Sequence, residues 1–325
     1  MKKVLVLNDL ADGFRDRVLN AAGCEYEVVF EEPEWSRETL LSHYADADVI
    51  LGEPDSEDLK VCQNLSLLQT SWAGVDHYIA AGIFGKDRTL CNGSGGYGPV
   101  IAEYAVGMIL SLCHRLPVYQ RFQKQNVWKP QPYHRTLENS IVLILGAGDI
   151  GTELAKRLKP FHCKRVGVRW TAQPCPDEFH EMITMEKLDK WLPKADVVVC
   201  SLPSTPQTRR LFDEKRLLQM KSDAILVNVG RGDLIVADDL AKVMKTGHLW
   251  GAVLDVTDPE PLPQDHPLWQ MENVILTPHV SGSCISPDSP TKIRLSQIMV
   301  SNLENYVKGR PLCNVVDCEL GYRKR

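Results

Sequence analysis

SIVLILGAGDIGTELAKRL, residues 140–158, joins an apolar run to a helix-forming run through a glycine-rich turn. The nearly all-apolar run 140–146 is typical of a strand that is covered on both faces of a sheet. The segment after the turn, TELAKRL, has helical character. Gly146, Gly148 and Gly151 stand between them with the spacing G-x-G-x-x-G. The stretch therefore predicts a strand, a tight turn and a helix, the opening of a parallel α/β unit.

Each of the three glycines has a physical task in such a unit. Gly146 permits the tight turn, Gly148 lets the backbone approach a pyrophosphate, and Gly151 lets the helix pack closely on the strand. The pyrophosphate would meet the positive end of the helix, beside Asp149 and Ile150. A glycine-rich turn without a ligand is the alternative, and the flanking strand and helix favour the dinucleotide site over it.

The rest of the chain repeats this alternation of short apolar runs and longer helical segments. The expected strands form two series: 3–7, 27–30, 48–51 and 67–71, then 140–146, 165–169, 195–200, 223–230, 251–256 and 273–278. Helices are expected at 36–47, 98–116, 236–247 and 291–309, and a loop at 124–140. A βαβ rhythm implies parallel sheets, so the sequence predicts an α/β fold.

The composition fits a globular protein of about two domains. The 325 residues are 44% apolar and 24% charged, with a net charge of −5, which gives no reason to expect nucleic acid or an anionic membrane as partner. The first apolar run, VLVL, is followed at once by acidic residues and fits a buried strand rather than a secretion signal. Ten scattered cysteines without a C-x-x-C pair are typical of reduced thiols in a cytoplasmic protein, and no metal-ligand spacing surrounds them.

The predicted strand after the glycine turn ends at Arg169, 18 residues beyond Gly151. A carboxylate at this point normally accepts hydrogen bonds from the ribose hydroxyls of NAD. A guanidinium would instead hold a ribose 2′-phosphate through two parallel hydrogen bonds. Thr171 could add a hydroxyl next to Trp170. A solvated surface arginine is the alternative, but the missing carboxylate and the gained cation together favour NADP(H), with NAD(H) as the second possibility.

Three further polar residues follow predicted strands of the second series. Arg231, Glu260 and His279 are separated by 29 and then 19 residues, yet the carboxyl ends of parallel strands meet at one edge of a sheet. Reduction of a 2-oxo acid needs a cation for the carboxylate and carbonyl, which suits Arg231. It also needs a proton donor near neutral pH, which suits His279, with Glu260 hydrogen-bonded to the imidazole. Any one of them alone is more often structural or solvated.

The chain resembles the D-isomer-specific 2-hydroxyacid dehydrogenases over nearly its whole length. The resemblance rests on GAGDIG, LPSTPQT, VNVGRGDLI, LDVTDPEPLP and NVILTPHVSG, with SWAGVDHY and SGGYGPVIAEYAVG in the first half. It implies that Arg231, Glu260 and His279 are catalytic. It also implies that the amides near Ala73 and Gly74 hold the substrate carboxylate, with Trp72 and Tyr97 lining the substrate pocket. The residues that would line the cofactor site are Leu202, Pro203, Thr208, Val229, Gly230, Asp255 and Gly282, with Asp255 near the nicotinamide carboxamide.

The same resemblance implies a domain organisation that the residues alone do not give. A flavodoxin-like substrate domain, 1–98 plus 287–325, would contain an inserted Rossmann cofactor domain, 99–286, with the active site in the cleft. The helix 98–116 would belong to the region through which such enzymes form homodimers. The arginine after the second strand and the sequence GGYG are similar to the NADPH-preferring glyoxylate and hydroxypyruvate reductases. Cys284 stands where many relatives have threonine.

Two other functions remain open on this basis. One is an NAD-dependent relative, such as a D-lactate or phosphoglycerate dehydrogenase, in which Arg169 has no part in cofactor choice. The other is a protein of the same fold that binds NAD(P) without turnover, as transcriptional corepressors do. We expect an NADPH-preferring reductase of a small 2-oxo acid, and a substrate panel with both cofactors distinguishes the three.

Overall fold

The computed structural model describes residues 1–85, 87–283, 286 and 288–323, and the chain forms two compact units. Unit 1 comprises Met1–Tyr97 with Cys284–Arg325, and unit 2 comprises Gly98–Ser283. No helix within the described ranges combines the length and the apolar character that a membrane crossing requires. Each unit is built around its own parallel sheet, so the predicted fold class, two parallel-sheet α/β domains, is confirmed.

The sheet of unit 1 has five parallel strands in the order β2-β1-β3-β4-β5. The strands are β1 Lys2–Val6, β2 Tyr26–Phe30, β3 Val49–Leu51, β4 Leu67–Gln69 and β5 Thr89–Cys91. Val4 of β1, the second strand in this order, lies between Val28 and Val49 in register. The order 2-1-3-4-5 is that of flavodoxin-like folds, in which ligands bind beyond the carboxyl ends of the strands.

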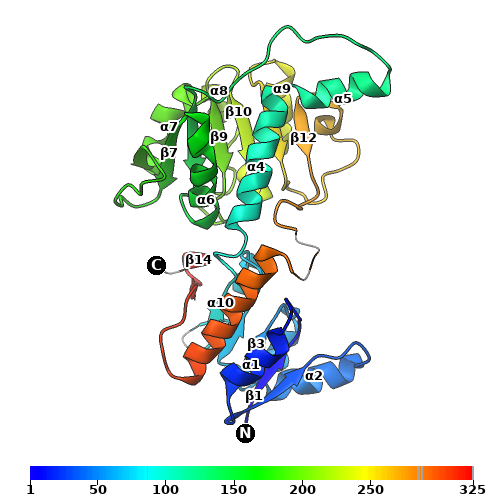
Figure 1. Ribbon diagram of the computed structural model, residues 1–325, viewed down its shortest axis with the longest axis vertical. Coiled ribbons are helices and arrows are strands. Elements are labelled where there is room, and N and C mark those ends of the chain that lie inside the picture. Colours follow the sequence, from blue (N-terminus) through cyan, green and yellow to red (C-terminus); the bar gives the residue numbers. More distant parts are fainter. Residues whose placement is uncertain (86, 284–285, 287, 324–325) are drawn as a thin grey trace. The chain divides into compact units, whose positions relative to one another are not determined.

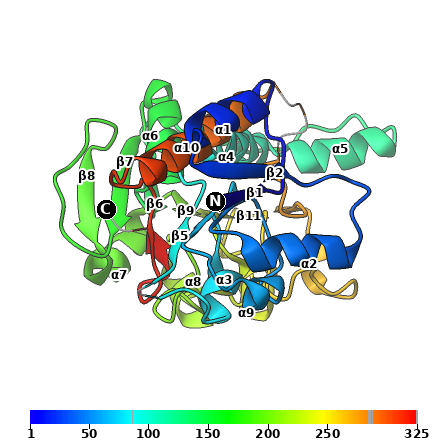
Figure 2. The same cartoon turned by 90° about the horizontal axis from the view of Figure 1, so that it is seen from below.

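Helices cover both faces of this sheet, as Figure 2 shows. One face carries α1 Phe14–Ala22 and α10 Pro290–Val307, and the other carries α2 Arg37–Asp46, α3 Asp76–Ala80 and the short helix η1 Asp58–Val61. Phe14 of α1 packs with Leu295 and Met299 of α10 in one buried cluster. The fully buried amide of Asn302 on α10 donates to the side-chain oxygen of Gln69 at 2.5 Å. The helix nearest the carboxyl end of the chain is therefore part of the first unit's core. A short antiparallel pair, β13 Val316–Asp317 and β14 Tyr322–Arg323, follows it.

The sheet of unit 2 has seven parallel strands in the order β12-β11-β10-β9-β6-β7-β8. The strands are β6 Ile141–Leu145, β7 Lys164–Arg169, β8 Glu181–Thr184, β9 Val197–Cys200, β10 Ile225–Asn228, β11 Gly251–Leu254 and β12 Val274–Leu276. Counted from β6, the order is the doubly wound 3-2-1-4-5-6 arrangement with one strand added. The direction of winding reverses between β6 and β9.

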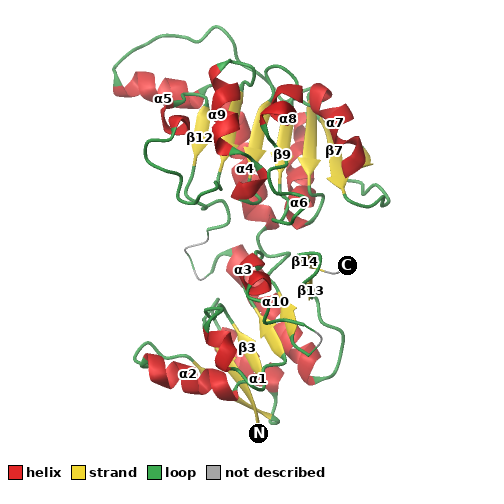
Figure 3. Cartoon of the chain, turned by 180° about the vertical axis from the view of Figure 1, so that it is seen from behind, coloured by secondary structure: helices red, strands yellow, loops and turns green. Residues whose placement is uncertain are grey.

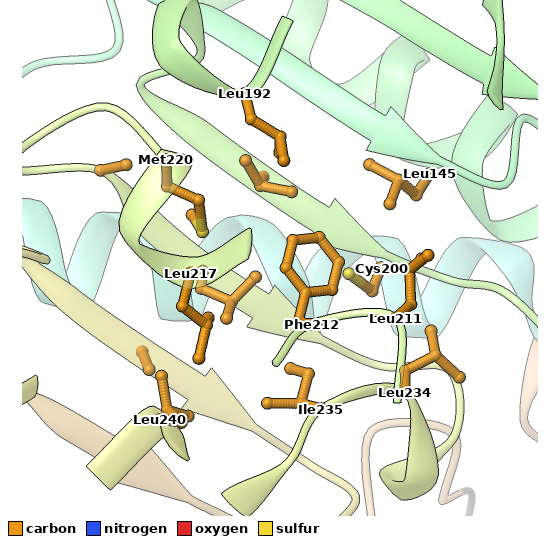
Figure 4. Packing of buried hydrophobic residues seen from close by; sticks show 14 of the residues in the cluster. Leu145, Leu192, Cys200, Leu211, Phe212, Leu217, Met220, Leu234, Ile235 and Leu240 are labelled. Carbon is orange, nitrogen blue, oxygen red and sulfur yellow. The ribbon is translucent and has the colours of Figure 1, made fainter. Parts of the chain in front are cut away.

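Two layers of helices enclose this second sheet (Figures 1 and 3). One face carries α4 Gly98–Cys113 and α6 Asp149–Leu158, and the other carries α7 Leu188–Trp191, α8 Glu214–Gln219 and α9 Ala237–Lys245. Figure 4 shows Phe212, fully buried, among side chains from strands β6 and β9 and from α8 and α9. The remaining short helices are η2 Lys159–Phe161, η3 Met185–Lys187, η4 Leu192–Lys194, η5 Gly232–Leu234 and η6 Pro267–Gln270.

The strands and helices predicted from the apolar runs are confirmed, but one predicted helix is shorter than expected and several elements were missed. The helix predicted for 98–116 ends at Cys113, because Arg115 has a φ of 54° and starts a separate helix, α5 Leu116–Lys124. The guanidinium of Arg115 lies 4.0 Å from the centre of the Trp250 ring and donates to the Tyr133 carbonyl at 2.9 Å. The polar loop predicted after residue 124 begins where α5 ends. Strands β5 and β8 were also missed, since both are short and neither is an uninterrupted apolar run.

Candidate active site

The glycine turn of unit 2 is formed as its sequence predicts. Gly146 has a φ of 97°, and a Cβ there would lie 2.8 Å from the carbonyl oxygen of Ser201. A Cβ on Gly151 would lie 2.2 Å from the carbonyl oxygen of Gly146, so α6 approaches the turn as only glycine allows. Gly148 directly precedes the first residue of α6, Asp149. The turn and the helix N-terminus, with its unsatisfied N–H groups, fit a dinucleotide pyrophosphate.

Asp149 also ties the glycine turn to helix α4. Its carboxylate accepts a hydrogen bond of 2.9 Å from the backbone N–H of Gly98, at the start of α4. A Cβ on Gly98 would lie 2.6 Å from that same carboxylate, so the two backbones stand close. Ile150, half-buried in the first turn of α6, completes the residues predicted at this end of the helix.

Arg169 lies beside the same turn. It ends β7, the neighbour of β6 in the sheet, and its guanidinium donates to the carbonyl oxygen of Ala147 and to the side-chain oxygen of Gln173. Ala147 is the residue between the first two glycines of the motif. Trp170 and Thr171 follow on the exposed surface. A cation therefore lies next to the glycine turn where NAD-binding proteins usually have a carboxylate.

The turn that carries Arg231 is set by a buried asparagine. Asn228, fully buried at the end of β10, donates to the carbonyl of Arg231 at 2.8 Å and accepts from the N–H of Gly230 at 3.1 Å. A Cβ on Gly230 would lie 2.6 Å from the carbonyl of Leu202, so this turn abuts the loop after β9. Val229, in the same turn, is buried. The Arg231 guanidinium, half-buried, donates to the carbonyl of Gly230 at 2.9 Å.

The loop LPSTPQT, residues 202–208, is stabilised by hydrogen bonds of its own last residue, Thr208. Its fully buried hydroxyl donates to the carbonyl of Pro203 at 2.7 Å and accepts from the N–H of Thr205 at 2.8 Å. Sequence reasoning assigned Thr208 to the cofactor site. In the structure its hydroxyl shapes the loop that carries Leu202 and Pro203, so a contact of Thr208 with a cofactor stays a prediction.

Asp255 organises the loop that carries the histidine. Its side chain is 1% exposed and accepts from the Thr277 hydroxyl at 2.6 Å, from Val280 N–H at 2.9 Å and from Ser281 N–H at 3.0 Å. A contact of Asp255 with a nicotinamide stays a prediction. Through its hydrogen bonds to residues on both sides of His279, Asp255 holds the loop that carries this histidine. Gly282 follows this loop, and Cys284 lies outside the described residues.

His279 and Glu260 form a direct pair. The distance between Nδ1 of His279 and Oε1 of Glu260 is 2.7 Å, and both side chains are about half exposed. The backbone of His279 has a φ of 55°, and its N–H donates to the carbonyl of Asp255 at 2.8 Å. Because the carboxylate uses Nδ1, Nε2 is the ring atom that can exchange a proton with a substrate. The carboxylate fixes both the tautomer and the orientation of the ring.

Arg231, Glu260 and His279 all follow the carboxyl ends of strands of the second sheet. Arg231 follows β10, Glu260 follows β11 and His279 follows β12, three strands that are adjacent and parallel. The loops after β10 and β11 abut, since a Cβ on Gly232 would lie 1.9 Å from the carbonyl oxygen of Thr257. The parallel topology therefore brings together residues that are far apart in the sequence.

The predicted substrate loop belongs to unit 1, at the carboxyl end of β4. Glu53 accepts from the N–H of Ser71 at 2.6 Å, and Asn92 donates to the carbonyl of Ala73 at 2.7 Å. Among the described residues, none accepts a hydrogen bond from the backbone N–H groups of Ala73 and Gly74. These two amides are therefore available to an anion.

The two aromatic residues predicted beside this loop differ in their surroundings. Trp72 is 49% exposed, and its ring centre lies 5.9 Å from that of His77. Tyr97 is half-buried and packs against the cluster that joins α1 and α10 to the sheet. Tyr97 therefore has a packing role in unit 1, and a contact with substrate stays a prediction for both rings.

Sequence reasoning missed several residues that hold the site together. Asn228 is a polar residue at the end of an otherwise apolar strand, so its sequence carried a usable signal. Glu53 and Thr277 have none, because their partners lie 18 and 22 residues away in the sequence. In the part of the chain that the structure describes, no group of three or more histidine, cysteine, aspartate or glutamate side chains could hold a metal ion.

Comparison with known proteins identifies the family. The family model for the NAD binding domain of D-isomer specific 2-hydroxyacid dehydrogenases matches residues 106–281. Glyoxylate reductase of Thermofilum pendens is 32% identical over 87% of this chain and 85% of that protein. Glyoxylate reductase/hydroxypyruvate reductase of Mus musculus is 30% identical over 96% and 97%. A mitochondrial formate dehydrogenase of Hordeum vulgare is 32% identical over 91% and 80%.

Solved structures agree with the family. A D-isomer specific 2-hydroxyacid dehydrogenase family protein of Aeromonas salmonicida is 34% identical, with a TM-score of 0.83 over 98% of this chain and 99% of that one. A D-isomer specific 2-hydroxyacid dehydrogenase of Xanthobacter autotrophicus, in complex with NADPH and MES, is 26% identical with a TM-score of 0.82 over 99% and 100%. An NAD-dependent formate dehydrogenase of Staphylococcus aureus, in complex with NAD, is 25% identical with a TM-score of 0.71 over 98% and 99%.

These findings place the protein among the nicotinamide-dependent oxidoreductases. More specifically, the chain belongs to the D-isomer specific 2-hydroxyacid dehydrogenase family. The family acts on the CH–OH group of its substrates with NAD or NADP. The resemblance stated from the sequence is thereby confirmed.

Gly151→Ala tests the close approach of α6 to the glycine turn. The added methyl group meets backbone rather than a flexible side chain, so we expect a cost of about 1–3 kcal/mol in the free energy of unfolding. NADPH affinity should fall at the same time, because the N-terminus of α6 must shift. Thermal unfolding and fluorescence titration with NADPH measure the two effects. Lys159→Ala, an exposed residue just beyond α6, is the control. A variant with unchanged stability and affinity contradicts the packing argument.

Proposed function

We propose that this protein reduces a small 2-oxo acid of the glyoxylate or hydroxypyruvate type to the D-2-hydroxy acid, with NADPH as the preferred cofactor. The observation that carries the proposal is the 2.7 Å bond between His279 and Glu260, at the strand edge that also carries Arg231. A cation, a proton donor and an orienting carboxylate are the groups that carbonyl reduction requires. Relatives named for this reaction support the substrate class.

The roles of the three side chains follow from their chemistry. When bound, the nicotinamide supplies the hydride to the carbonyl carbon. The Arg231 guanidinium binds the substrate carboxylate and polarises the carbonyl oxygen. Nε2 of His279 donates a proton to the oxygen as negative charge develops on it. Glu260 stabilises the imidazolium through Nδ1 and keeps the ring oriented.

The loop after β4, in unit 1, also carries donors that suit a carboxylate. The backbone N–H groups of Ala73 and Gly74 suit an anion, since their loop is held from behind by Glu53 and Asn92. Trp72 would contribute an apolar wall next to them. A carboxylate is an anion that these two amides suit.

The preference for NADPH is proposed on the position of Arg169. Its guanidinium lies against the glycine turn, at the end of the strand where an acidic residue would exclude a phosphorylated ribose. Thr171 adds a hydroxyl close by. The family member of Xanthobacter autotrophicus, which was solved with NADPH, supports the choice, whereas the Staphylococcus aureus relative was solved with NAD.

His279→Ala tests the reaction itself. We expect kcat/KM for glyoxylate with NADPH to fall by roughly 10²- to 10⁴-fold, because the proton donor is lost. The Kd for NADPH should stay unchanged, which shows that the fold and the cofactor site are intact. NADPH oxidation followed by absorbance gives the rates. Wild-type protein without turnover on any 2-oxo acid, or a variant with wild-type rates, refutes the proposal.

Arg169→Asp tests the cofactor preference. The change removes the charge-assisted bonds and places a carboxylate near the 2′-phosphate, so we expect KM for NADPH to rise by about 100-fold. KM for NADH should change by no more than about threefold, which is under 0.7 kcal/mol. Lys190→Asp, on the exposed side of α7, repeats the charge change as a control. Equal losses with both cofactors would point to an NAD-dependent relative.

A homodimer is proposed on the apolar side chains of the segment around α5. The helix and the loop after it project from the rest of unit 2, as Figures 1 and 3 show. Trp128 is 100% exposed and Tyr133 is 70% exposed on this loop, while Leu116 is 47% exposed at the start of the helix. Exposed aromatic residues on a projecting segment are typical of a contact surface.

Sedimentation equilibrium tests this association. Wild-type protein should have twice the mass of one chain, and Trp128→Asp should shift it toward the monomer, because a charge in an apolar contact is unfavourable. Leu218→Asp, at an exposed position of α8, should leave the mass unchanged. A monomeric wild type contradicts the homodimer.

A cytoplasmic location is also proposed. Its basis is that the free cysteines Cys62, Cys91 and Cys200 are buried as small apolar residues.

A further inference from the structure

A chain of short hydrogen bonds runs from helix α4 to the histidine loop. The hydroxyl of Tyr104, on α4, lies 2.6 Å from Oγ1 of Thr277. Thr277 follows β12, and its hydroxyl lies 2.6 Å from Oδ1 of Asp255. The carboxylate of Asp255 in turn accepts the N–H groups of Val280 and Ser281. Neither Tyr104 nor Thr277 belongs to the residues assigned above to cofactor or substrate.

The direction of each bond follows from the number of protons available. Asp255 receives two backbone N–H groups through its carboxylate oxygens, so the bond with Thr277 is one in which the hydroxyl donates. A threonine hydroxyl has one proton, so towards Tyr104 it can only accept. Tyr104 is therefore the donor at the start of the chain. Burial raises the pKa of Tyr104 to about 12, so its proton is present throughout the pH range of an assay.

These hydrogen bonds matter because the carboxylate that they reach is buried. Asp255 is 1% exposed, and a buried polar group that loses its partner costs far more than the same group in water. The backbone N–H of His279 donates to the carbonyl of Asp255. The position of the histidine therefore depends on Asp255, which the hydrogen bonds from Tyr104 and Thr277 hold in place. A shift of Thr277 or Asp255 would move His279 relative to Glu260.

We infer that Tyr104 is a positioning residue, which acts through Thr277 and Asp255 to hold the His279 loop in the arrangement that proton transfer requires. This rests on the proposed function as far as turnover is concerned. It adds two residues to the site and makes α4 part of the catalytic support. Tyr104 touches no reacting atom in this scheme, so its removal should lower kcat without weakening NADPH binding.

Kinetics of four variants test the order of the chain. Tyr104→Phe removes one donor, and we expect kcat for glyoxylate to fall by about 5- to 10-fold with KM for NADPH unchanged. Thr277→Val breaks both bonds and should cost about 30- to 100-fold. Thr277→Ser keeps the hydroxyl and should restore kcat to within about threefold. In the double variant Tyr104→Phe/Thr277→Val, the tyrosine change should add no further loss, since it acts through Thr277.

A matched control separates this role from the general effect of losing a tyrosine hydroxyl. Tyr119, half-buried on α5, accepts from the N–H of Gln131 at 2.9 Å and lies 3.1 Å from His134, with no link to Asp255. Tyr119→Phe should leave kcat and KM unchanged. If Tyr104→Phe also leaves kcat unchanged, or lowers it equally in the Thr277→Val background, the inference is wrong.

Hydrogen–deuterium exchange supplies a readout that needs no turnover. With NADPH bound, the amides of residues 277–283 should exchange faster in Tyr104→Phe and Thr277→Val than in wild type, and at the wild-type rate in Thr277→Ser and Tyr119→Phe. Unchanged exchange in Tyr104→Phe overturns the inference. A wild-type protein that reduces no 2-oxo acid but shows this exchange pattern refutes the proposed function and leaves the positioning chain standing.

Discussion

The absence of a side chain at residue 151 is the constraint on which unit 2 depends. It lets α6 approach the end of β6 so closely that a single methyl group would collide with the Gly146 carbonyl. The position of α6 then fixes α4, because the first carboxylate of α6 holds the first amide of α4. One helix end therefore determines both the turn that suits a pyrophosphate and the helix that carries Tyr104.

The groups proposed to act in the reaction are half-buried or exposed, whereas the groups that hold them are buried. Arg231, Glu260 and His279 stand on loops, half-buried or exposed, where a substrate can reach them. Behind them, Asn228 and Asp255 are almost fully buried and take their hydrogen bonds from the backbone of those same loops. In a medium of low dielectric such bonds are strong, and their loss leaves an unsatisfied group. Loops can therefore carry a precise geometry although they belong to no helix or strand.

Much of the fold and the principal candidate residues could be predicted from the sequence. Apolar runs gave most strands, since strands covered on both faces leave little room for polar residues. Strand β8 was missed because it is an edge strand with Glu181 and Thr184 in it, and α5 because Arg115 ends one helix and begins the next within a continuous helical pattern. The contribution of Thr277 to the site was missed because its partners are distant in the sequence. Tyr104 comes from helix α4, and Asp255 follows strand β11.

By itself, the sequence determined the glycine turn, the replacement of a carboxylate by Arg169, and the family, because each depends on residue identity at a fixed spacing. Only the tertiary structure decided that Asn302 is hydrogen-bonded to Gln69, that Arg169 lies against Ala147, and that Asp255 is occupied by the histidine loop. The physical reason is the range of the interactions. Spacing along the chain records local turns and helices, whereas hydrogen bonds between buried groups join segments that meet only after the sheets have formed.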